Sequence, residues 1–360
     1  MSRGPRSDAL IVVQVWLATR LSFAVLAVAL AITGGQNLDA VVAQWDVAHY
    51  LAIATGGYTD PQQMAFFPGW PLILGAFDAV GLPPVLLGSV VALGCSLAAA
   101  FALQRLGGRW AAVAWLLAPT AIFTAVPYTE AAFCAAAFWS WERARKDRWG
   151  QAALLAALAC TLRVSGLFLV GALVILAITQ KRRRSDRLGT RLAWLILPAA
   201  VLVAYTAYLY GLTGSWTAWY SAQQAGWQRE FHWPWEAVAQ HWSQLWVPNA
   251  DHPEWVWVFR AELVAWAVGI LVAAIALIRK QIAEAAWVGV QVLAFSLSYW
   301  LMSVNRAVLL WFPLWEQIGS FVESRPASRG WIVLGWGAGL VAFALQMVWA
   351  WLYLTGRWAS

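Results

Sequence analysis

The stretch that decides the fold is LIVVQVWLATRLSFAVLAVALAIT, residues 10–33. Its only ionisable residue is Arg20. At a rise of about 1.5 Å per residue it is long enough to cross a hydrocarbon core of roughly 30 Å as one helix. Further runs of this kind are residues 83–106, 192–212, 256–278, 283–302 and 331–354. The pattern is typical of a membrane protein with many crossing helices.

The composition of the whole chain points the same way. Of the 360 residues, 62% are hydrophobic and 11% are charged, and the mean hydropathy is +0.63. A soluble enzyme, a disordered chain, a collagen and a disulfide scaffold are excluded, because none of them carries so apolar a composition. The net charge of +7 does not indicate nucleic-acid binding, since the positions of charges decide their meaning in a membrane protein.

Shorter or interrupted apolar runs occupy residues 110–126, 128–141, 152–162, 164–179 and 308–321. Together, all these runs predict one all-α integral membrane domain, residues 1–360, a transmembrane helical bundle with about eleven crossings. Residues 65–81 are the exception, because Pro68 and Pro71 predict a broken or re-entrant element. The first run lacks a small-residue cleavage pattern, so we expect it to stay as the first helix.

Basic residues predict the orientation, because short cytoplasmic loops retain Lys and Arg. If the segments cross alternately, the basic clusters share one side: Arg3, Arg6, Arg105, Arg109, Arg143, Arg145, Lys146, Arg148, residues 181–191, Arg279, Lys280, Arg325 and Arg329. That side is predicted to be the cytoplasm and to hold the N-terminus. The other side receives two long loops, residues 34–64 and the Trp-rich residues 213–255, in which loop helices are expected. Acidic residues gather there, so chemistry is expected on the external face.

An aspartate and a histidine stand three residues apart in the first long loop, in Trp45-Asp46-Val47-Ala48-His49-Tyr50. On a helix they share one face, which pairs a carboxylate with an imidazole. The alternative is a helix N-cap beside an interfacial histidine. No metal site is expected, because the other histidines, His232, His241 and His252, have no ligand spacing. The three cysteines lie in apolar segments and predict no disulfide framework.

Three arginines lie within or between apolar runs, where a charged side chain is costly to place in a membrane. Arg163 and Arg306 occupy very short external turns between apolar runs, and Arg20 lies inside the first run and needs an internal partner or a lipid head group. A guanidinium offers a fixed fork of donors to an anion, so Arg163 and Arg306 are candidate phosphate ligands; snorkelling at the interface is the alternative. Glu130 is either an orienting carboxylate or an ordinary helix-start residue.

Aromatic side chains mark two further segments. Phe67, Pro68 and Pro71 belong to a proline and aromatic cluster, residues 65–72, which is a candidate wall of a substrate groove. The second long loop is rich in tryptophan, including Trp227, Trp235 and Trp242. These tryptophans are typical of a membrane-interface belt, and beside Gln, Arg and Glu they are also what a sugar or lipid head group docks on.

Motif blocks follow one another along the chain: Trp45-Asp46, His49-Tyr50, Gly57-Tyr58, Ala65-Phe66-Phe67-Pro68 with Pro71-Leu72, Pro119-Thr120-Ala121-Ile122-Phe123 with Tyr128-Thr129-Glu130, Arg163-Val164-Ser165-Gly166, and Ser303-Val304-Asn305-Arg306 with Phe312-Pro313-Leu314. In this order they resemble the motifs of PIG-V-type mannosyltransferases, the family of GPI mannosyltransferase 2. The departures are Ala118, Thr129 and Ala307, the last in place of a tyrosine.

The resemblance implies a GT-C-type enzyme that moves a hexose, usually mannose, from a polyprenyl-phosphate carrier to a lipid or glycan acceptor on the non-cytoplasmic face. It implies no cofactor, no catalytic metal and inversion at the anomeric carbon. Asp46 would be the general base, Arg163 and Arg306 the phosphate clamp, His49 a head-group partner and Glu130 an orienting group. Trp45, Tyr50 and Tyr128 would contribute to the substrate site.

Other functions stay open at this point. A transporter or flippase of lipid-linked sugars would share the groove and the arginines, but it would not need an external Asp beside a His. A non-catalytic scaffold would not need Asp46, Glu130 and both arginines. A GT-C enzyme for another sugar, such as glucose or arabinose, also stays open. The use of arginine over lysine, with abundant Ala, Gly and Trp, predicts a GC-rich genome and a bacterial plasma (inner) membrane.

Overall fold

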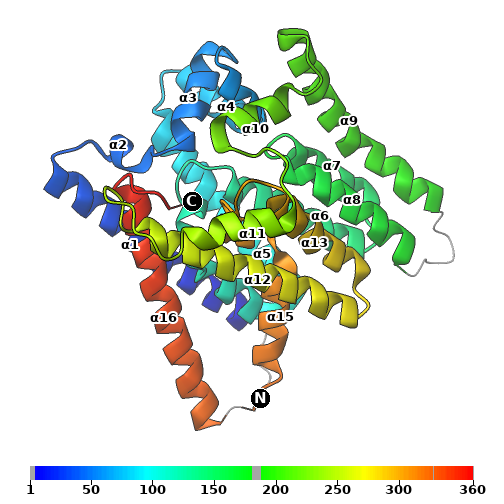
Figure 1. Ribbon diagram of the computed structural model, residues 1–360. Coiled ribbons are helices and arrows are strands. Elements are labelled where there is room, and N and C mark those ends of the chain that lie inside the picture. Colours follow the sequence, from blue (N-terminus) through cyan, green and yellow to red (C-terminus); the bar gives the residue numbers. More distant parts are fainter. Residues whose placement is uncertain (1–4, 181–187, 327, 360) are drawn as a thin grey trace. The chain divides into compact units, whose positions relative to one another are not determined.

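The computed structural model describes residues 5–180, 188–326 and 328–359, and within these ranges every regular element is a helix (Figure 1). The contacts divide the chain into two compact units. The first comprises residues 1–48, 76–138 and 309–359, and the second comprises residues 49–75 and 139–308. The all-α, polytopic fold class predicted from the sequence is confirmed.

The first unit contains helices that come from both ends of the chain. They are α1 (Pro5–Gly34), α2 (Leu38–Val42), α5 (Pro84–Leu116), η2 (Ala121–Thr124), α15 (Phe312–Glu323) and α16 (Arg329–Leu354). The second unit contains η1 (Pro61–Ala65), α7 (Trp149–Cys160), α8 (Ser165–Thr179), α9 (Leu188–Thr213), α10 (Ala218–Trp227), α11 (Pro234–Ser243), α12 (Trp255–Ile278), α13 (Ile282–Ser296) and α14 (Val304–Ala307). Four elements run from one unit into the other: α3 (Asp46–Gly56), α4 (Gly69–Asp78), α6 (Glu130–Arg145) and η3 (Val308–Leu310).

Five helices in the described ranges are long and apolar enough to cross a membrane: α1, α5, α9, α12 and α16. Each corresponds to one of the long runs in the sequence. The helix formed by the run 283–302 is shorter than predicted: α13 ends at Ser296, and the chain then turns toward α14. Shorter apolar helices are α7, α8 and α13. The total of eleven crossings stays a prediction.

Residues 65–81 form no long helix. The ten residues of α4 span about 15 Å, which is half of the hydrocarbon thickness. The run 110–126 also differs from a separate crossing: its first residues complete α5, and the chain continues through a turn into the short 3-10 helix η2. Backbone turns at Pro119 and Thr120 therefore interrupt a segment whose composition alone is apolar throughout.

The α5 helix breaks at Gly107 and Gly108, the latter with φ +80°, and α15 crosses it there. A Cβ atom added to Gly319 on α15 would lie 2.5 Å from the carbonyl oxygen of Gly107 and 2.9 Å from the backbone nitrogen of Ala111. The two helices thus meet backbone to backbone, which only a glycine permits at this position.

We expect Gly319→Val to lower the midpoint of thermal unfolding in detergent by on the order of 5 °C, because overpacking against a rigid backbone costs about 1–3 kcal/mol. The matched control is Gly337→Val on α16, where an added Cβ meets no atom within 4 Å. Equal shifts for the two variants would contradict the close approach of α5 and α15.

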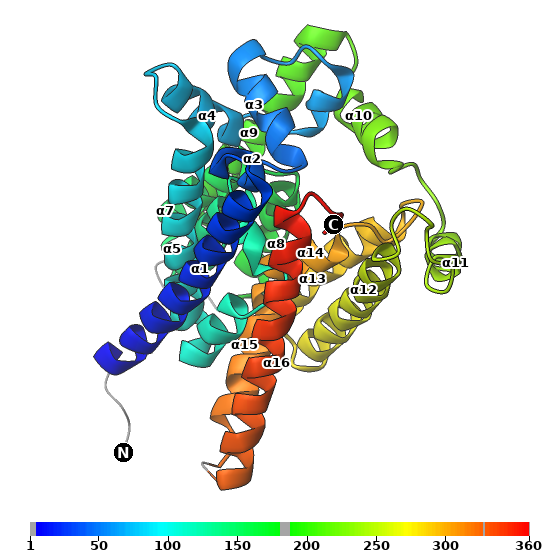
Figure 2. The ribbon, with the colours of Figure 1, turned by 90° about the vertical axis from the view of Figure 1, so that its left-hand side faces the viewer.

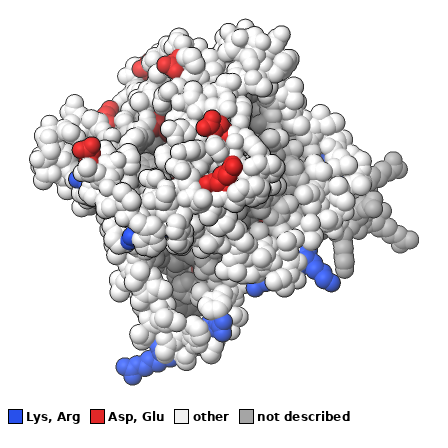
Figure 3. Space-filling view, in the orientation of Figure 1, with Lys and Arg blue, Asp and Glu red and all other residues white. Residues whose placement is uncertain are grey.

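Several basic residues of the first unit lie near the start of α1 and the start of α16. Arg109 pairs with Asp8 at the start of α1, with Nη1 and Oδ1 2.6 Å apart. Arg329 opens α16, whose other end meets α2 where Tyr353 donates to the carbonyl of Val42 at 2.9 Å (Figure 2). Basic side chains are visible at the α15–α16 end in Figure 3. The membrane orientation predicted from the basic clusters stays a prediction.

In the second unit, two of the basic residues are paired with carboxylates. At one end, Arg145 pairs with Glu284 and Arg191 pairs with Asp147, each at 2.8 Å. The opposite end of α7 leads into the turn that holds Arg163. Arg3, the side chain of Arg6 and residues 181–187, which also belong to the predicted basic clusters, lie outside the described residues.

The buried Arg20 has the internal partner that its depth requires. Its guanidinium donates to the hydroxyl of Thr124 at 2.6 Å and to that of Thr19 at 3.2 Å. This pairing ties the middle of α1 to η2, just before the segment that carries Tyr128 and Glu130.

Candidate active site

Two tyrosines hold the backbone that leads into Asp46, all within the first unit. The N–H of Asp46 donates to the hydroxyl of Tyr128 at 3.1 Å, and that hydroxyl donates to the carbonyl of Gln44 at 3.3 Å. Tyr353 donates to the carbonyl of Val42 at 2.9 Å. Asp46 is the first residue of α3, and its side chain is half-buried. Its carboxylate is therefore presented by a helix start whose path is fixed on the preceding residues.

Tyr128 itself is 1% exposed and packs against Phe123 and Tyr353, with ring centroids 5.1 and 5.6 Å away. Its hydroxyl thus contacts the backbone on both sides of Trp45, at Gln44 and Asp46. Trp45 has φ +54°, unusual for a residue with a side chain, and it is 48% exposed. Glu130 opens α6 and is fully buried, with Thr129 Oγ1 at 3.5 Å from its carboxylate.

Phe66 is the centre of the aromatic contacts in the second unit. His49 stacks on it with centroids 4.9 Å apart, Tyr50 meets it edge-on at 5.2 Å, and Trp227 of α10 meets it edge-on at 5.4 Å. The predicted groove residue Phe67 instead packs on Tyr205 at 4.3 Å. Since His49 and Trp227 also approach each other, at 6.1 Å, the second long loop reaches the predicted motif.

Tyr58 and Tyr205 hold the backbone of this segment. Tyr58 donates to the carbonyl of Phe66 at 2.8 Å, and Tyr205 donates to that of Met64 at 2.9 Å. Burial raises the pKa of Tyr58 above its ordinary value, so its hydroxyl stays protonated as a donor. Tyr58 of the Gly57-Tyr58 motif thus fixes the backbone at Phe66, on which His49 stacks.

The Arg163 turn packs on the Pro68–Pro71 segment through glycine contacts. Gly69 donates to the carbonyl of Thr161 at 2.8 Å, and a Cβ added to Gly69 would lie 2.5 Å from Thr161 Oγ1. A Cβ added to Gly166 would lie 2.7 Å from Cys160 Cα. Both motif glycines therefore allow close approach of the backbone around Arg163, whose side chain is half-buried. Pro71 lies buried in the first turn of α4, where a proline costs no helix hydrogen bond.

The Arg306 turn is held by an acidic residue of α12. Glu262 of α12 is fully buried and accepts the N–H of Ser303 at 2.8 Å and that of Asn305 at 2.7 Å. Ser303 has φ +67°, so the carboxylate stabilises a left-handed residue next to α14. The signal available in the sequence was an acidic side chain inside a long apolar run.

Arg229 connects the aromatic cluster to the Arg306 turn. It follows Trp227 by two residues, donates to the carbonyl of Met302 at 3.2 Å, and lies over the ring of Phe295 at 5.1 Å. The second unit therefore brings together His49, the Phe66–Gly69 segment, the Arg163 turn and the Arg306 turn. Asp46, Tyr128 and Glu130 belong to the first unit.

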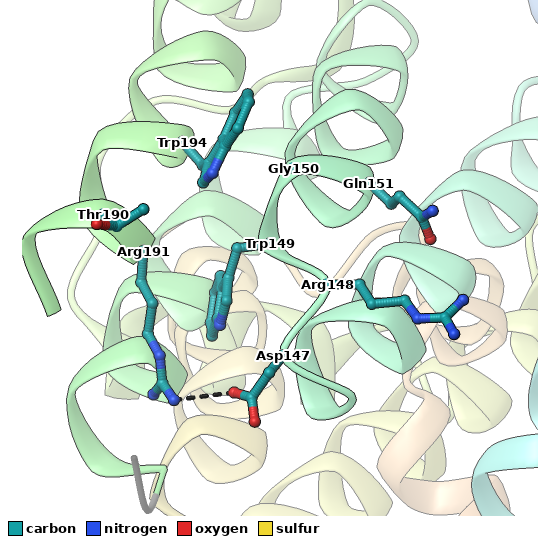
Figure 4. Close-up of a pocket in the computed structure, with 8 residues that line it drawn as sticks. All are labelled: Asp147, Arg148, Trp149, Gly150, Gln151, Thr190, Arg191 and Trp194. Carbon is teal, nitrogen blue, oxygen red and sulfur yellow. Dashed lines mark hydrogen bonds and ion pairs between the residues drawn. The ribbon is translucent and has the colours of Figure 1, made fainter. Parts of the chain in front are cut away.

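A cavity of about 340 Å³ lies at the other end of α7 from the Arg163 turn, and it contains none of the predicted site residues. Asp147, Arg148, Trp149, Gly150, Gln151, Thr190, Arg191 and Trp194 line it (Figure 4). Arg191 is fully buried and pairs with Asp147, while the side chains of Arg148 and Gln151 point away from that pair. Its donors do not converge on one point, so this cavity is a junction between α7 and α9.

The remaining histidines are occupied by local contacts. His241 Nε2 lies 2.8 Å from the carbonyl of Phe259, and burial lowers the pKa of this imidazole. His232 Nδ1 lies 3.5 Å from Glu236, and His252 stacks on Trp255 at 4.6 Å. Among the described residues, no group of three His, Cys, Asp or Glu side chains has the arrangement of a metal site.

The chain is similar to part of a set of curated mannosyltransferases. It is 34% identical over 152 residues to GPI alpha-1,6-mannosyltransferase 2 of Rattus norvegicus and 33% identical over 152 residues to that of Homo sapiens. The matched stretch covers 37% of this chain and 31% of the length of each relative. No family model matches the chain, and no solved structure matches it.

Proposed function

We propose that this chain is a membrane glycosyltransferase that moves mannose from a polyprenyl-phosphate-mannose donor to a lipid or glycan acceptor on the non-cytoplasmic face. The observation that carries the proposal is the presentation of Asp46 at the start of α3 by Tyr128 and the Gln44 carbonyl. The partial similarity to enzymes named mannosyltransferases supports the reaction class and the sugar. The preference for arginine over lysine supports a bacterial plasma membrane, and the placement of the basic clusters supports a cytoplasmic N-terminus.

The proposed step needs a base and a group that stabilises the leaving phosphate. Asp46 takes the proton from the acceptor hydroxyl, whose oxygen attacks the anomeric carbon from the face opposite the phosphate. The bond between that carbon and the phosphate oxygen breaks, and its electron pair stays on the polyprenyl phosphate. Arg163 and Arg306 offer guanidinium donors to this growing negative charge. The product has an inverted anomeric carbon.

The remaining motif residues would shape the binding surface. His49 is held flat on Phe66, and the half-buried ring keeps a polar edge for a sugar hydroxyl or a phosphate oxygen. Trp227 lies beside it and adds an aromatic face of the kind on which sugars dock. Glu130 and Tyr128 would act through their neighbours, because both are buried.

The first test is transfer of radiolabelled sugar by the purified full chain from synthetic polyprenyl-phosphate-mannose to membrane lipid and glycan extracts. We expect a labelled product with mannose and none with a nucleotide-sugar donor. Parallel donors with glucose and arabinose test the alternative of another sugar. Uptake of the labelled donor into proteoliposomes without transfer would instead establish a flippase and overturn the proposal.

We expect Arg306→Ala to raise the KM for the donor about 10- to 100-fold, because one charge-assisted hydrogen bond to phosphate contributes about 1.5–3 kcal/mol. The KM for the acceptor should change little. The control is Arg325→Ala, which removes an exposed arginine stacked on Phe321 at 4.1 Å. Initial rates at varied donor and acceptor concentrations give both constants, and an unchanged donor KM would contradict the clamp.

A further inference from the structure

The short helix α11 divides its side chains into three sectors. Residues spaced by three or four along the helix and its following turn share a sector. Ala237, His241 and Leu245 are buried. Glu236, Gln240 and Ser243 form a polar sector, and Trp235, Ala239, Trp242 and Trp246 form an exposed apolar sector, here called the Trp face. Its tryptophans are 52% to 64% exposed, which is costly if they face water.

The buried sector fastens α11 to α12 of the same unit. His241 Nε2 lies 2.8 Å from the carbonyl of Phe259, and Arg260 donates Nε and Nη2 to the carbonyl of Leu245 at 3.2 and 3.0 Å. The orientation of the Trp face is therefore set by hydrogen bonds on the opposite side of the helix.

The Trp face continues an exposed apolar stripe on α12. Trp257, Val264, Leu271 and Ile278 recur every seven residues and are 58% to 82% exposed, on a helix long and apolar enough to cross a membrane. The Arg260 guanidinium lies 5.4 Å from the ring of Trp246 and 4.7 Å from that of Trp257, so it joins the two surfaces. Since the stripe on a crossing helix faces acyl chains, the adjoining Trp face meets lipid at the end of that stripe.

We propose that α11 lies flat in the boundary between head groups and acyl chains, with the Trp face turned toward membrane lipid. Ten residues span about 15 Å and cannot cross the bilayer, whereas an amphipathic helix of this kind lies along the interface. Glu236 accepts the N–H of Trp233 at 3.0 Å and belongs to the polar sector, which faces the aqueous side.

The segment before α11 is hydrogen-bonded to the chain around the Arg306 turn. The N–H of His232, two residues before α11, donates to the carbonyl of Leu297 at 3.1 Å, and Arg229 donates to that of Met302. A helix anchored in the interface would therefore fix the bilayer level at which the Arg306 turn lies.

The test places a nitroxide label on the full chain at Ala239→Cys in the Trp face or at Ser243→Cys in the polar sector, in phosphatidylcholine proteoliposomes. Both positions are exposed, and both changes are small. We expect the label at position 239 to collide more with oxygen, which concentrates in lipid, and the label at position 243 more with a water-soluble nickel chelate. The unaltered chain, labelled in parallel, gives the background from Cys95, Cys134 and Cys160.

Other outcomes would overturn the proposal. Access of the nickel chelate to both labels would place α11 in water. A label at position 239 that neither reagent reaches, and that becomes accessible when the protein is diluted to one copy per vesicle, would assign the Trp face to a second copy. Access to water that is lost only when a polyprenyl phosphate is added would assign the Trp face to the substrate.

Discussion

Asp46→Asn should reduce the rate of sugar transfer by about 100- to 10,000-fold, which is the range that a positioned general base contributes. The backbone contact to Tyr128 uses the N–H of residue 46, which Asn retains, and Asn has nearly the same shape as Asp, so the variant should fold normally. The measurement is transfer of labelled mannose at saturating donor, with the thermal unfolding midpoint of each variant as the check on folding.

The matched control for this variant is Asp39→Asn. Asp39 lies in the first turn of α2, in the same unit and at the same end of α1, and its side chain is half-buried like that of Asp46. We expect near-normal transfer from it. Near-normal turnover by Asp46→Asn itself would show that the base is another group.

Glu262→Gln should lower kcat/KM for the donor about 10- to 100-fold, mainly through KM. The carboxylate accepts two backbone N–H groups next to Arg306, and an amide offers one acceptor oxygen in place of two. Each charge-assisted hydrogen bond contributes about 1.5–3 kcal/mol. If Glu262 acts through Arg306, the double variant Glu262→Gln with Arg306→Ala should be little worse than Arg306→Ala alone.

The control for Glu262 separates positioning from stability. Glu284→Gln also alters a buried carboxylate of the second unit, but Glu284 pairs with Arg145 at the opposite end of the helices. We expect it to lower thermal stability while the donor KM stays unchanged. Additive losses in the double variant, or an equal donor defect in Glu284→Gln, would show that Glu262 has only a structural role.

The crossing helices and the motif residues were accessible from sequence because each depends on local properties. Apolar runs of sufficient length specify α1, α9, α12 and α16, since a bilayer requires internal hydrogen bonding along a spanning segment. The depth of Arg20 predicted an internal partner or a lipid head group, and the structure shows an internal partner, Thr124. The role of Phe67 as a groove residue stays a prediction; the structure shows that its ring packs on Tyr205, while the ring of Phe66 stacks on His49.

The end of α13 was not accessible, because the apolar run continues beyond it. The chain turns where Glu262 binds the N–H groups of Ser303 and Asn305, and that contact joins residues about 40 positions apart. The break in α5 was not predicted, because the close approach that it permits depends on Gly319 of α15. Such contacts arise only when distant helices pack together.

By itself, the sequence determined that this protein is an all-α membrane protein and which residues carry ionisable groups at unusual depth, because hydropathy and charge act residue by residue. The tertiary structure alone decided which of them are held and by what: Tyr128 under the backbone of Asp46, Phe66 under His49, and Glu262 beside Arg306. The reason is physical, since hydrogen bonds and ring stacking act over a few ångströms and join segments that the sequence leaves far apart.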